Sequence, residues 1–142
     1  MQLFPTPENK APHDAKAIEL ITQDRVRLRA AVATPKSPKG TVLILGGRAE
    51  FIERYFETMN DIVKMGYAVA TFDWRGQGGS DRLIPDKNRG YVRSFADYDS
   101  DIDTVYSRLL VAHCPRPGSL CHTPGFQERF RSRRFETAVS CQ

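Results

Sequence analysis

Cysteine is scarce in this sequence, and long apolar runs are absent. All three cysteines lie after residue 113, and the first residues show no basic segment followed by an apolar one. An odd number of cysteines without such a leader argues against a disulfide framework, so we expect a reducing compartment, the cytoplasm. No run reaches the length that a bilayer-spanning helix needs, so no transmembrane segment is predicted.

Positive charge is in excess, but the excess is local. The net charge is +4 and the isoelectric point is near 9.1, values that would suit a nucleic acid or an anionic membrane as partner. Four of the arginines, however, stand between residues 129 and 134. The phenylalanines around them are too few and too irregularly spaced for a base-stacking platform, so we expect no nucleic-acid partner.

The remaining composition is that of a globular domain, and its spacing predicts an α/β fold. Residues 17–22 and 25–34 are predicted to be two strands of an antiparallel hairpin that turns through residues 23–24. In the second strand, apolar residues alternate with arginines, the last of which is Arg29. This alternation indicates one solvent-facing side, which fits an antiparallel hairpin at an edge of the sheet.

The middle of the chain predicts a parallel βαβ unit. Residues 41–45 are apolar or β-branched without a polar alternation, which is typical of a strand buried on both faces. Two glycines (46–47) follow, where the backbone can approach a ligand closely. Residues 52–65 repeat apolar side chains every three or four positions, which predicts a helix capped by Gly66. Residues 67–74 are the second buried strand.

A second helix is predicted to begin at Ser94, because Ser94 and Asp97 resemble a capping box. Its aspartates gather toward the N-terminal end, at Asp97, Asp99, Asp101 and Asp103. We interpret them as a solvated acidic face rather than a metal site, since the helix dipole favours negative charge there.

The composition changes after about Val111. Residues 113–142 are rich in Arg, Ser, Pro, Cys and His and show neither a strand pattern nor an apolar periodicity. Two His/Cys pairs stand there, but the six residues between Cys114 and Cys121 do not fit common zinc modules. No metal or cofactor site is therefore predicted. We expect a flexible arm over residues 1–16, a folded part over 17–112 and an irregular basic tail over 113–142.

Three blocks carry a more specific pattern: GGRAEFIERY (46–55), FDWRGQGGSDR (72–82) and RGYVRSFADYDSDIDTV (89–105). In this order and at these distances they resemble the serine aminopeptidase, monoacylglycerol lipase and lysophospholipase branch of the α/β-hydrolase superfamily. The first block is similar to an HGxGEHxxRY-like loop, with Gly46 where His usually stands. The other two are similar to the DxRGxGxS and GHVxxFxxYxxDL segments of the branch, with Tyr91 in place of His.

The resemblance implies the N-terminal part of an α/β-hydrolase sheet, an antiparallel hairpin plus the parallel βαβ unit. It also implies that the loop after residues 41–45 gives one backbone N–H to an oxyanion hole. By position this donor belongs to Arg48, with Gly47 beside it. A fixed backbone dipole suits the role because negative charge develops on the substrate oxygen only in the transition state.

The same resemblance assigns structural roles to the turn after the second buried strand. Asp73, Arg75, Gly76 and Gly78 are expected to brace that turn. Ser80 stands in GGSDR rather than in GxSxG, and the family uses this serine structurally, so we do not expect it to be a nucleophile.

A nucleophile elbow is missing from the sequence. No GxSxG occurs, and in the family the acid and the histidine of the triad would come later still. We therefore expect a sheet truncated before the elbow and regard residues 113–142 as a candidate for out-of-frame sequence. The family's strand order would then leave residues 41–45 as a bare apolar edge that is prone to aggregation.

Two functions stay open. The resemblance implies a serine hydrolase of lysophospholipids or monoacylglycerols, with a small lipid or ester substrate and transient contact with a membrane surface. As this chain it would be inactive, because the nucleophile is absent. The alternative is a non-catalytic binding or interaction fragment.

Overall fold

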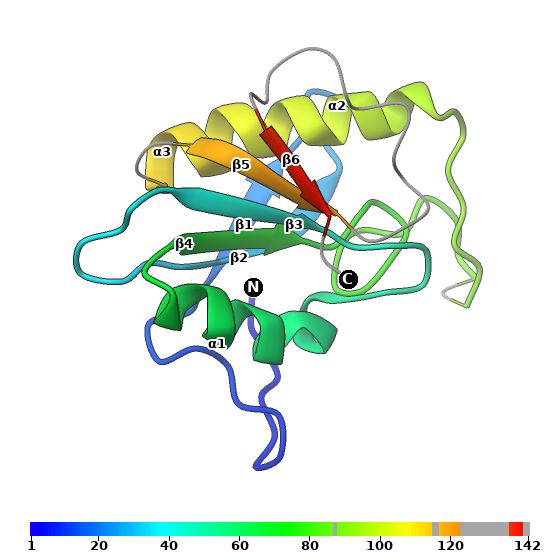
Figure 1. Ribbon diagram of the computed structural model, residues 1–142. Coiled ribbons are helices and arrows are strands. Elements are labelled where there is room, and N and C mark those ends of the chain that lie inside the picture. The colour runs from blue at the N-terminus through cyan, green and yellow to red at the C-terminus, as the bar shows by residue number, and fades with distance from the viewer. Residues whose placement is uncertain (87, 115–116, 123–136, 141–142) are drawn as a thin grey trace.

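A single mixed sheet forms the centre of the fold and carries helices on both faces (Figure 1). The computed structural model describes residues 1–86, 88–114, 117–122 and 137–140. Within these residues, six strands lie in the order β1-β2-β4-β3-β5-β6. The strands are β1 (Lys16–Ile21), β2 (Arg27–Ala33), β3 (Thr41–Leu45), β4 (Ala68–Phe72), β5 (Pro117–His122) and β6 (Thr137–Ser140).

Two helical segments cover the sheet. On one face, α1 (Phe56–Lys64) follows a 3₁₀ turn (Ile52–Tyr55). On the other face lies a continuous helical segment made of α2 (Ala96–Thr104), a π-helical stretch (Val105–Leu110) and α3 (Val111–His113). No helix in the described part of the chain is long and apolar enough to cross a membrane.

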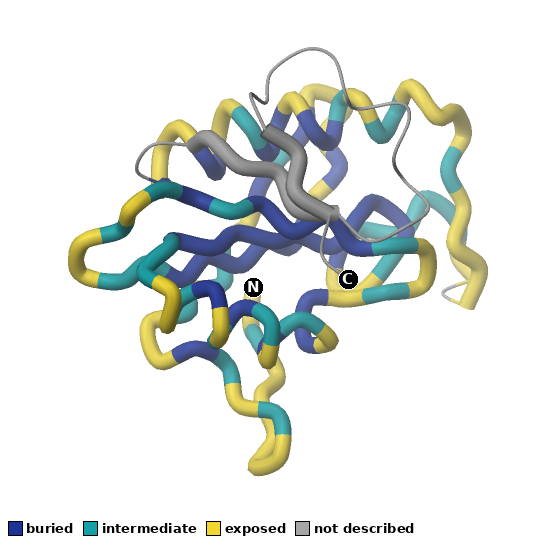
Figure 2. Tube along the Cα trace, in the orientation of Figure 1, coloured by how far each residue is buried: buried dark blue, intermediate teal, exposed yellow. Residues whose placement is uncertain are grey.

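Alternate residues of the central strands point into two separate cores. Ile44 of β3 packs with Phe56 of α1 in one core. Its neighbour Leu43 packs with Leu109 of the opposite helix in the other core. Burial on both faces explains why β3 and β4 are apolar without alternation, and Figure 2 shows these strands as the most buried part of the trace.

The predicted parallel βαβ unit is confirmed. β3 and β4 pair in parallel, with Thr41 opposite Ala68 and Leu45 opposite Phe72. The helix between them ends at Lys64, and Gly66, whose φ is +88°, follows its C-cap. The Gly66 N–H donates to the Val63 carbonyl and the Tyr67 N–H to the Ile62 carbonyl, the two bonds of a Schellman motif.

The antiparallel hairpin is confirmed and forms one edge of the sheet, with β1 outermost. β2 pairs antiparallel with β1 on one side and with β4 on the other. The predicted solvent-facing side is wrong at Arg29, which is only 4% exposed. The alternation of charge misled because this guanidinium is buried together with carboxylate partners that lie far away in the sequence.

A strand follows the second helix, contrary to the sequence prediction. β5 pairs in parallel with β3, and β6 pairs in parallel with β5. The edge of β3 that was expected to be bare is therefore covered. β5 contains proline and glycine and has no apolar periodicity. Its own residues therefore lack the features by which a strand is predicted from sequence.

The N-terminal arm, expected to be flexible, is attached to the domain. The Phe4 N–H donates to the Glu53 carboxylate, and the Asn9 amide donates to the Glu53 carbonyl. The Asn60 side chain of α1 binds the Lys10 carbonyl. Apolar residues of the arm also pack against the core beneath α1.

Candidate active site

The loop that leaves β3 lies at the carboxyl ends of the parallel strands, where α/β sheets place their ligands. The Gly46 carbonyl accepts a hydrogen bond of 2.8 Å from the Trp74 indole N–H, which ties the start of the loop to the end of β4. The next residues turn outward, and Gly47 is half-buried whereas Arg48 and Ala49 are exposed.

Glu50 holds this loop from inside. Its carboxylate accepts the Gly47 N–H at 2.5 Å and the hydroxyl of Tyr55 through the same oxygen. Donation from Tyr55 is the largest cause of a lowered pKa of Glu50; the Gly47 N–H and the charge of Arg54 act in the same direction, whereas partial burial opposes them. Glu50 is therefore ionised at neutral pH.

Ala49 closes the loop in a left-handed conformation, with a φ of 63°. Its N–H donates to the side-chain carbonyl of Gln77, which comes from the turn after β4. No hydrogen bond of the Arg48 N–H is recorded with any part of the chain that the structure describes. The two residues singled out in the sequence thus lie side by side, with one N–H bound to Glu50 and the other open.

Asp73 is the centre of the scaffold behind the loop. One carboxylate oxygen accepts the Ile52 N–H at 2.9 Å, and the other accepts the Gly79 N–H and the Arg29 Nε, each at 2.7 Å. Arg29 continues the network with a two-pronged ion pair to Glu53. A buried charge is tolerated only when it is paired and hydrogen-bonded, and all three side chains meet that condition.

The glycines of the second block are explained by close approach. A Cβ at Gly78 would lie 2.2 Å from the Asp73 carboxylate, and a Cβ at Gly79 would lie 2.6 Å from Arg29 Nε. At Gly76, where φ is +77°, a Cβ would lie 2.8 Å from the Tyr91 carbonyl oxygen. Only glycine fits these positions, which supports the expected bracing role of the turn.

Ser80 is structural, as expected. Its hydroxyl donates to the Asp73 carbonyl at 2.6 Å and accepts the Arg29 N–H at 2.9 Å. The side chain is buried, and both hydrogen-bonding directions are used within the scaffold. A hydroxyl committed in this way is not placed to attack a substrate.

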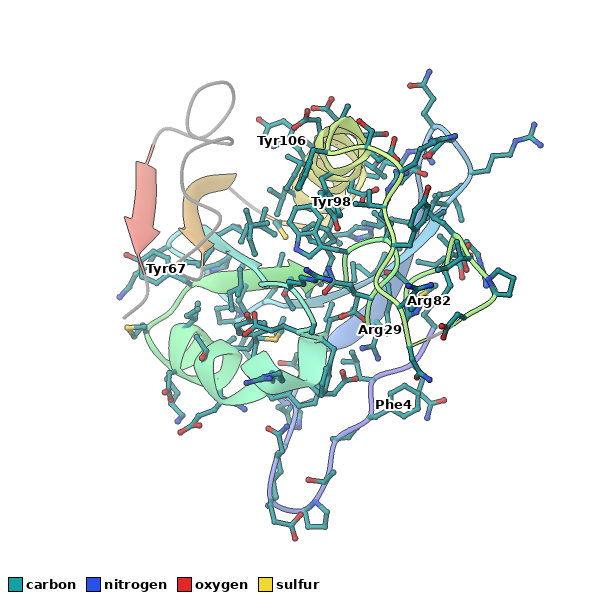
Figure 3. All side chains as sticks on the ribbon, turned by 90° about the vertical axis from the view of Figure 1, so that its right-hand side faces the viewer. Phe4, Arg29, Tyr67, Arg82, Tyr98 and Tyr106 are labelled. Atoms are coloured by element: carbon teal, nitrogen blue, oxygen red, sulfur yellow. The ribbon has the colours of Figure 1, made fainter. Side chains whose placement is uncertain are left out.

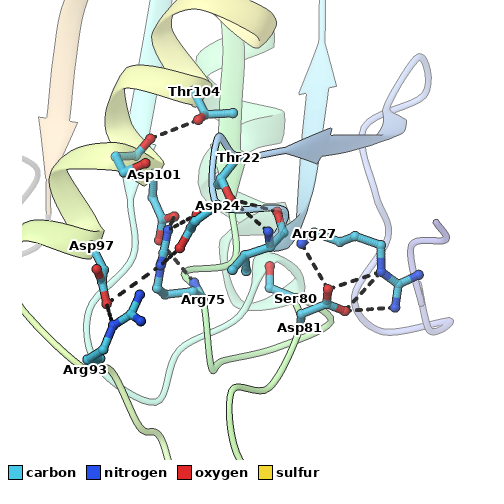
Figure 4. Close-up of polar contacts among 12 residues, drawn as sticks. Thr22, Asp24, Arg27, Arg75, Ser80, Asp81, Arg93, Asp97, Asp101 and Thr104 are labelled. Atoms are coloured by element: carbon cyan, nitrogen blue, oxygen red, sulfur yellow. Dashed lines mark hydrogen bonds and ion pairs between the residues drawn. The ribbon is translucent and has the colours of Figure 1, made fainter.

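A second buried network ties the long helix to the hairpin turn (Figure 4). Arg75 binds Asp101 of α2 at 2.7 Å and Asp24 of the β1–β2 turn at 2.7 Å. The Arg75 guanidinium lowers the pKa of Asp24 to about 2. Asp101 is fully buried, so the prediction that the acidic residues of this helix form a solvated face is wrong at this position.

A cavity of about 460 Å³ opens between the N-terminal arm and the Asp73 scaffold. Phe4 and Phe51 contribute apolar walls, and the Arg29–Glu53 pair lies at its base. The Arg29 guanidinium stands 5.7 Å from the centre of the Phe4 ring, and Figure 3 shows Phe4 on the arm near Arg29. The charges at the base satisfy each other, so the cavity offers a largely apolar surface.

Sequence reasoning found the loop and the scaffold turn but missed Glu50, Glu53 and Arg29. Glu50 stands within the first quoted block, together with Tyr55, so that block already held the signal for it. No spacing rule predicted Arg29 or Glu53, because their pairing bridges 24 residues of sequence. The described residues contain no group of three or more His, Cys, Asp or Glu side chains that could hold a metal ion.

An antiparallel hairpin beside a parallel βαβ unit, with a glycine loop at the end of β3, is the arrangement expected for the N-terminal part of an α/β-hydrolase sheet. The chain belongs to the serine aminopeptidase S33 family, whose model matches residues 36–121. The match includes the glycine loop, Asp73 with the glycines that follow it, and the long helix.

Two curated relatives share part of this sequence, and one solved structure shares its fold. Lysophospholipase L2 of Escherichia coli K12 is 41% identical over 67 residues, which are 47% of this chain and 20% of that protein. Probable lysophospholipase L2 of Haemophilus influenzae is 29% identical over 87 residues, 61% of this chain and 27% of that protein. The chain thus spans about a quarter or less of the length of these relatives.

The solved structure is the Pf2001 esterase of Pyrococcus furiosus, which superposes with a TM-score of 0.58 at 22% identity. The match covers 77% of this chain and 41% of the esterase. At this level of identity the likeness shows the fold.

Proposed function

We propose that this chain supplies one backbone donor to the oxyanion hole of a serine hydrolase that acts on lysophospholipid or monoacylglycerol esters. The observation that supports it is the open N–H of Arg48 in the loop at the carboxyl end of β3. Glu50 and Gln77 hold the amides on either side of Arg48, and we call these two contacts the clamp. The lysophospholipase relatives support a lipid ester as substrate class. A lipid substrate also implies transient contact with a membrane surface.

The chemistry of such a site is acyl transfer. A serine hydroxyl attacks the ester carbonyl, a histidine accepts its proton, and the carbonyl oxygen becomes an oxyanion. The Arg48 N–H would donate to that oxygen, and the clamp would keep the donor fixed so that it need not reorganise during the reaction. The Arg48 side chain is exposed and is not required for this role.

The nucleophile is the missing part. The 142 residues contain no GxSxG, and Ser80 is committed to the scaffold. We therefore propose that this chain, as given, does not hydrolyse esters. Incubation with a fluorophosphonate probe and a p-nitrophenyl ester should give no labelling and no release above a buffer blank; labelling would reveal a nucleophile outside the GxSxG pattern.

The coding DNA offers a direct test of the change in composition after Val111. Sequencing codons 105 to 142 and translating all three frames would show whether another frame continues with a strand and GxSxG. If so, the protein of that frame should release fatty acid from a lysophospholipid. If no frame does, the second candidate, a non-catalytic binding fragment, is favoured, since the absent nucleophile is the observation that speaks for it.

The Arg48 donor can be tested in a reading frame that carries the nucleophile. Arg48→Pro removes the N–H and should lower kcat/KM by about 10²–10³, the usual effect of losing one oxyanion donor. Arg48→Ala keeps the N–H and is the matched control, so its kcat/KM should change little. Equal losses in the two variants would assign the effect to the side chain and contradict the proposal.

A further inference from the structure

Glu50 directs one carboxylate oxygen back into its own loop. It accepts a peptide N–H from Gly47 and a hydroxyl from Tyr55, which lies in the 3₁₀ turn that follows the loop. One acidic side chain therefore joins the start of the loop to the start of the helix.

The loop is fixed on its other side as well. The Ala49 N–H donates to Gln77, and the Gly46 carbonyl accepts from Trp74, both of which belong to the segment after β4. Ala49 adopts a left-handed backbone, which costs a non-glycine residue free energy and persists only where the surroundings enforce it. Among the successive amides of Gly47, Arg48 and Ala49, two are thus occupied.

We propose that Glu50 is a positioning residue that occupies the Gly47 N–H, so that with the Ala49 N–H bound to Gln77 only Arg48 keeps an open donor among these three successive amides of the described loop. The catalytic consequence rests on the proposed function. The geometric claim does not, because the Gly47–Glu50 contact exists whether or not the chain carries a nucleophile.

The charged and titratable groups around Glu50 make the clamp sensitive to protonation. Tyr55 donates to the carboxylate, and Arg54 adds a favourable charge. Gln77 faces the loop from the opposite side and carries no charge. Since a protonated carboxyl is a weaker acceptor, the Gly47 N–H should lose its partner as Glu50 takes up a proton.

The test follows the Gly47 amide by ¹⁵N nuclear magnetic resonance in the chain as it is. In the wild type, the amide shift should titrate with a midpoint below the ordinary range of a glutamate. In Glu50→Ala, amide exchange at Gly47 should be at least about tenfold faster at neutral pH. Glu57→Ala, at an exposed glutamate of α1, is the matched control and should leave Gly47 unchanged.

Two further variants separate a clamp from a general structural effect. Glu50→Gln keeps an acceptor oxygen, so it should restore much of the protection while abolishing the pH titration of Gly47. Tyr55→Phe removes the hydroxyl donor, so the titration midpoint should rise toward the ordinary value of a glutamate. The wild-type titration reports the contact by itself, so it does not depend on Glu50→Ala remaining folded.

The proposal is overturned if Gly47 exchange is the same in Glu50→Ala and Glu57→Ala, or if Gly47 still titrates in Glu50→Gln. Failure of the proposed function looks different. In that case the Gly47 readouts behave as described, but Arg48→Pro leaves hydrolysis unchanged in a reading frame with the nucleophile.

Discussion

At the scale of single residues, Asp73 explains most of the second sequence block. Its carboxylate accepts donors from three segments, and the space around it is so narrow that the neighbouring positions must be glycine. The glycines of this short turn are therefore required by a buried network that the sequence pattern does not display. The glycines are visible in the sequence, whereas the reason for them becomes visible only in the structure.

Gly78→Ala tests this explanation. The new Cβ would meet the Asp73 carboxylate at 2.2 Å in a backbone of positive φ. We expect the free energy of unfolding to fall by about 2–5 kcal/mol, the sum of overpacking and left-handed strain. Denaturant unfolding measures it. Gly90→Ala is the control, because no atom lies within 4 Å of its Cβ; a similar loss there would contradict the explanation.

At the scale of elements, hydrophobic spacing predicted the hairpin, the βαβ unit and the long helix, because these elements bury continuous apolar stripes. It failed where a charged side chain is buried. Arg29 looked solvent-facing by alternation, yet it is paired with Asp73, 44 residues away. Asp101 looked solvated on its helix, yet it lies against Arg75, 26 residues away. Periodicity reports which side of an element is apolar, but it does not report partners from other elements.

The link between α2 and the hairpin turn predicts a dependence of stability on pH. Arg75 lowers the folded-state pKa of Asp24 from the ordinary 3.8 to about 2. A depressed pKa contributes stability above the unfolded-state value, and that stability is lost as the pH falls through the folded-state value. Asp24 is partly exposed, so solvent screening reduces the size of the effect.

We therefore expect Asp24→Asn to be less stable than the wild type above about pH 5, with a difference that shrinks as the pH falls from about 4 to about 2. Urea unfolding over that range measures it. Asp61→Asn, which removes a surface pair with Lys64, is the control and should show a much smaller change with pH. A difference that stays constant down to pH 2 would contradict the assigned partner.

At the scale of the whole molecule, the order of the strands decides which backbone N–H and C=O groups are paired and which are left open to solvent. The sequence placed β3 at a bare edge because residues 113–142 show no strand pattern. In the structure, β5 pairs in parallel with β3 despite that composition. An edge strand offers unpaired N–H and C=O groups with which another segment can pair. The sequence of that segment need not show a strand pattern of its own.

Deletion of residues 115–142 should uncover that edge. The β3 amides that face β5 should then exchange with solvent quickly, whereas those that face β4 should keep their protection. Hydrogen exchange read by mass spectrometry or magnetic resonance distinguishes the two sets, and the amides of β1, at the far edge, serve as an internal control. Unchanged exchange throughout β3 would contradict the pairing with β5.

The attachment of the first residues has a practical consequence for making the protein. The Gln2 carbonyl accepts a hydrogen bond from Arg29, and the Phe4 N–H donates to Glu53, so contacts with the buried network already begin at Gln2. An affinity tag fused directly to Met1 would crowd this contact. A tag placed there calls for a spacer and a cleavage site, and the melting temperature before and after cleavage would report how firmly the arm holds.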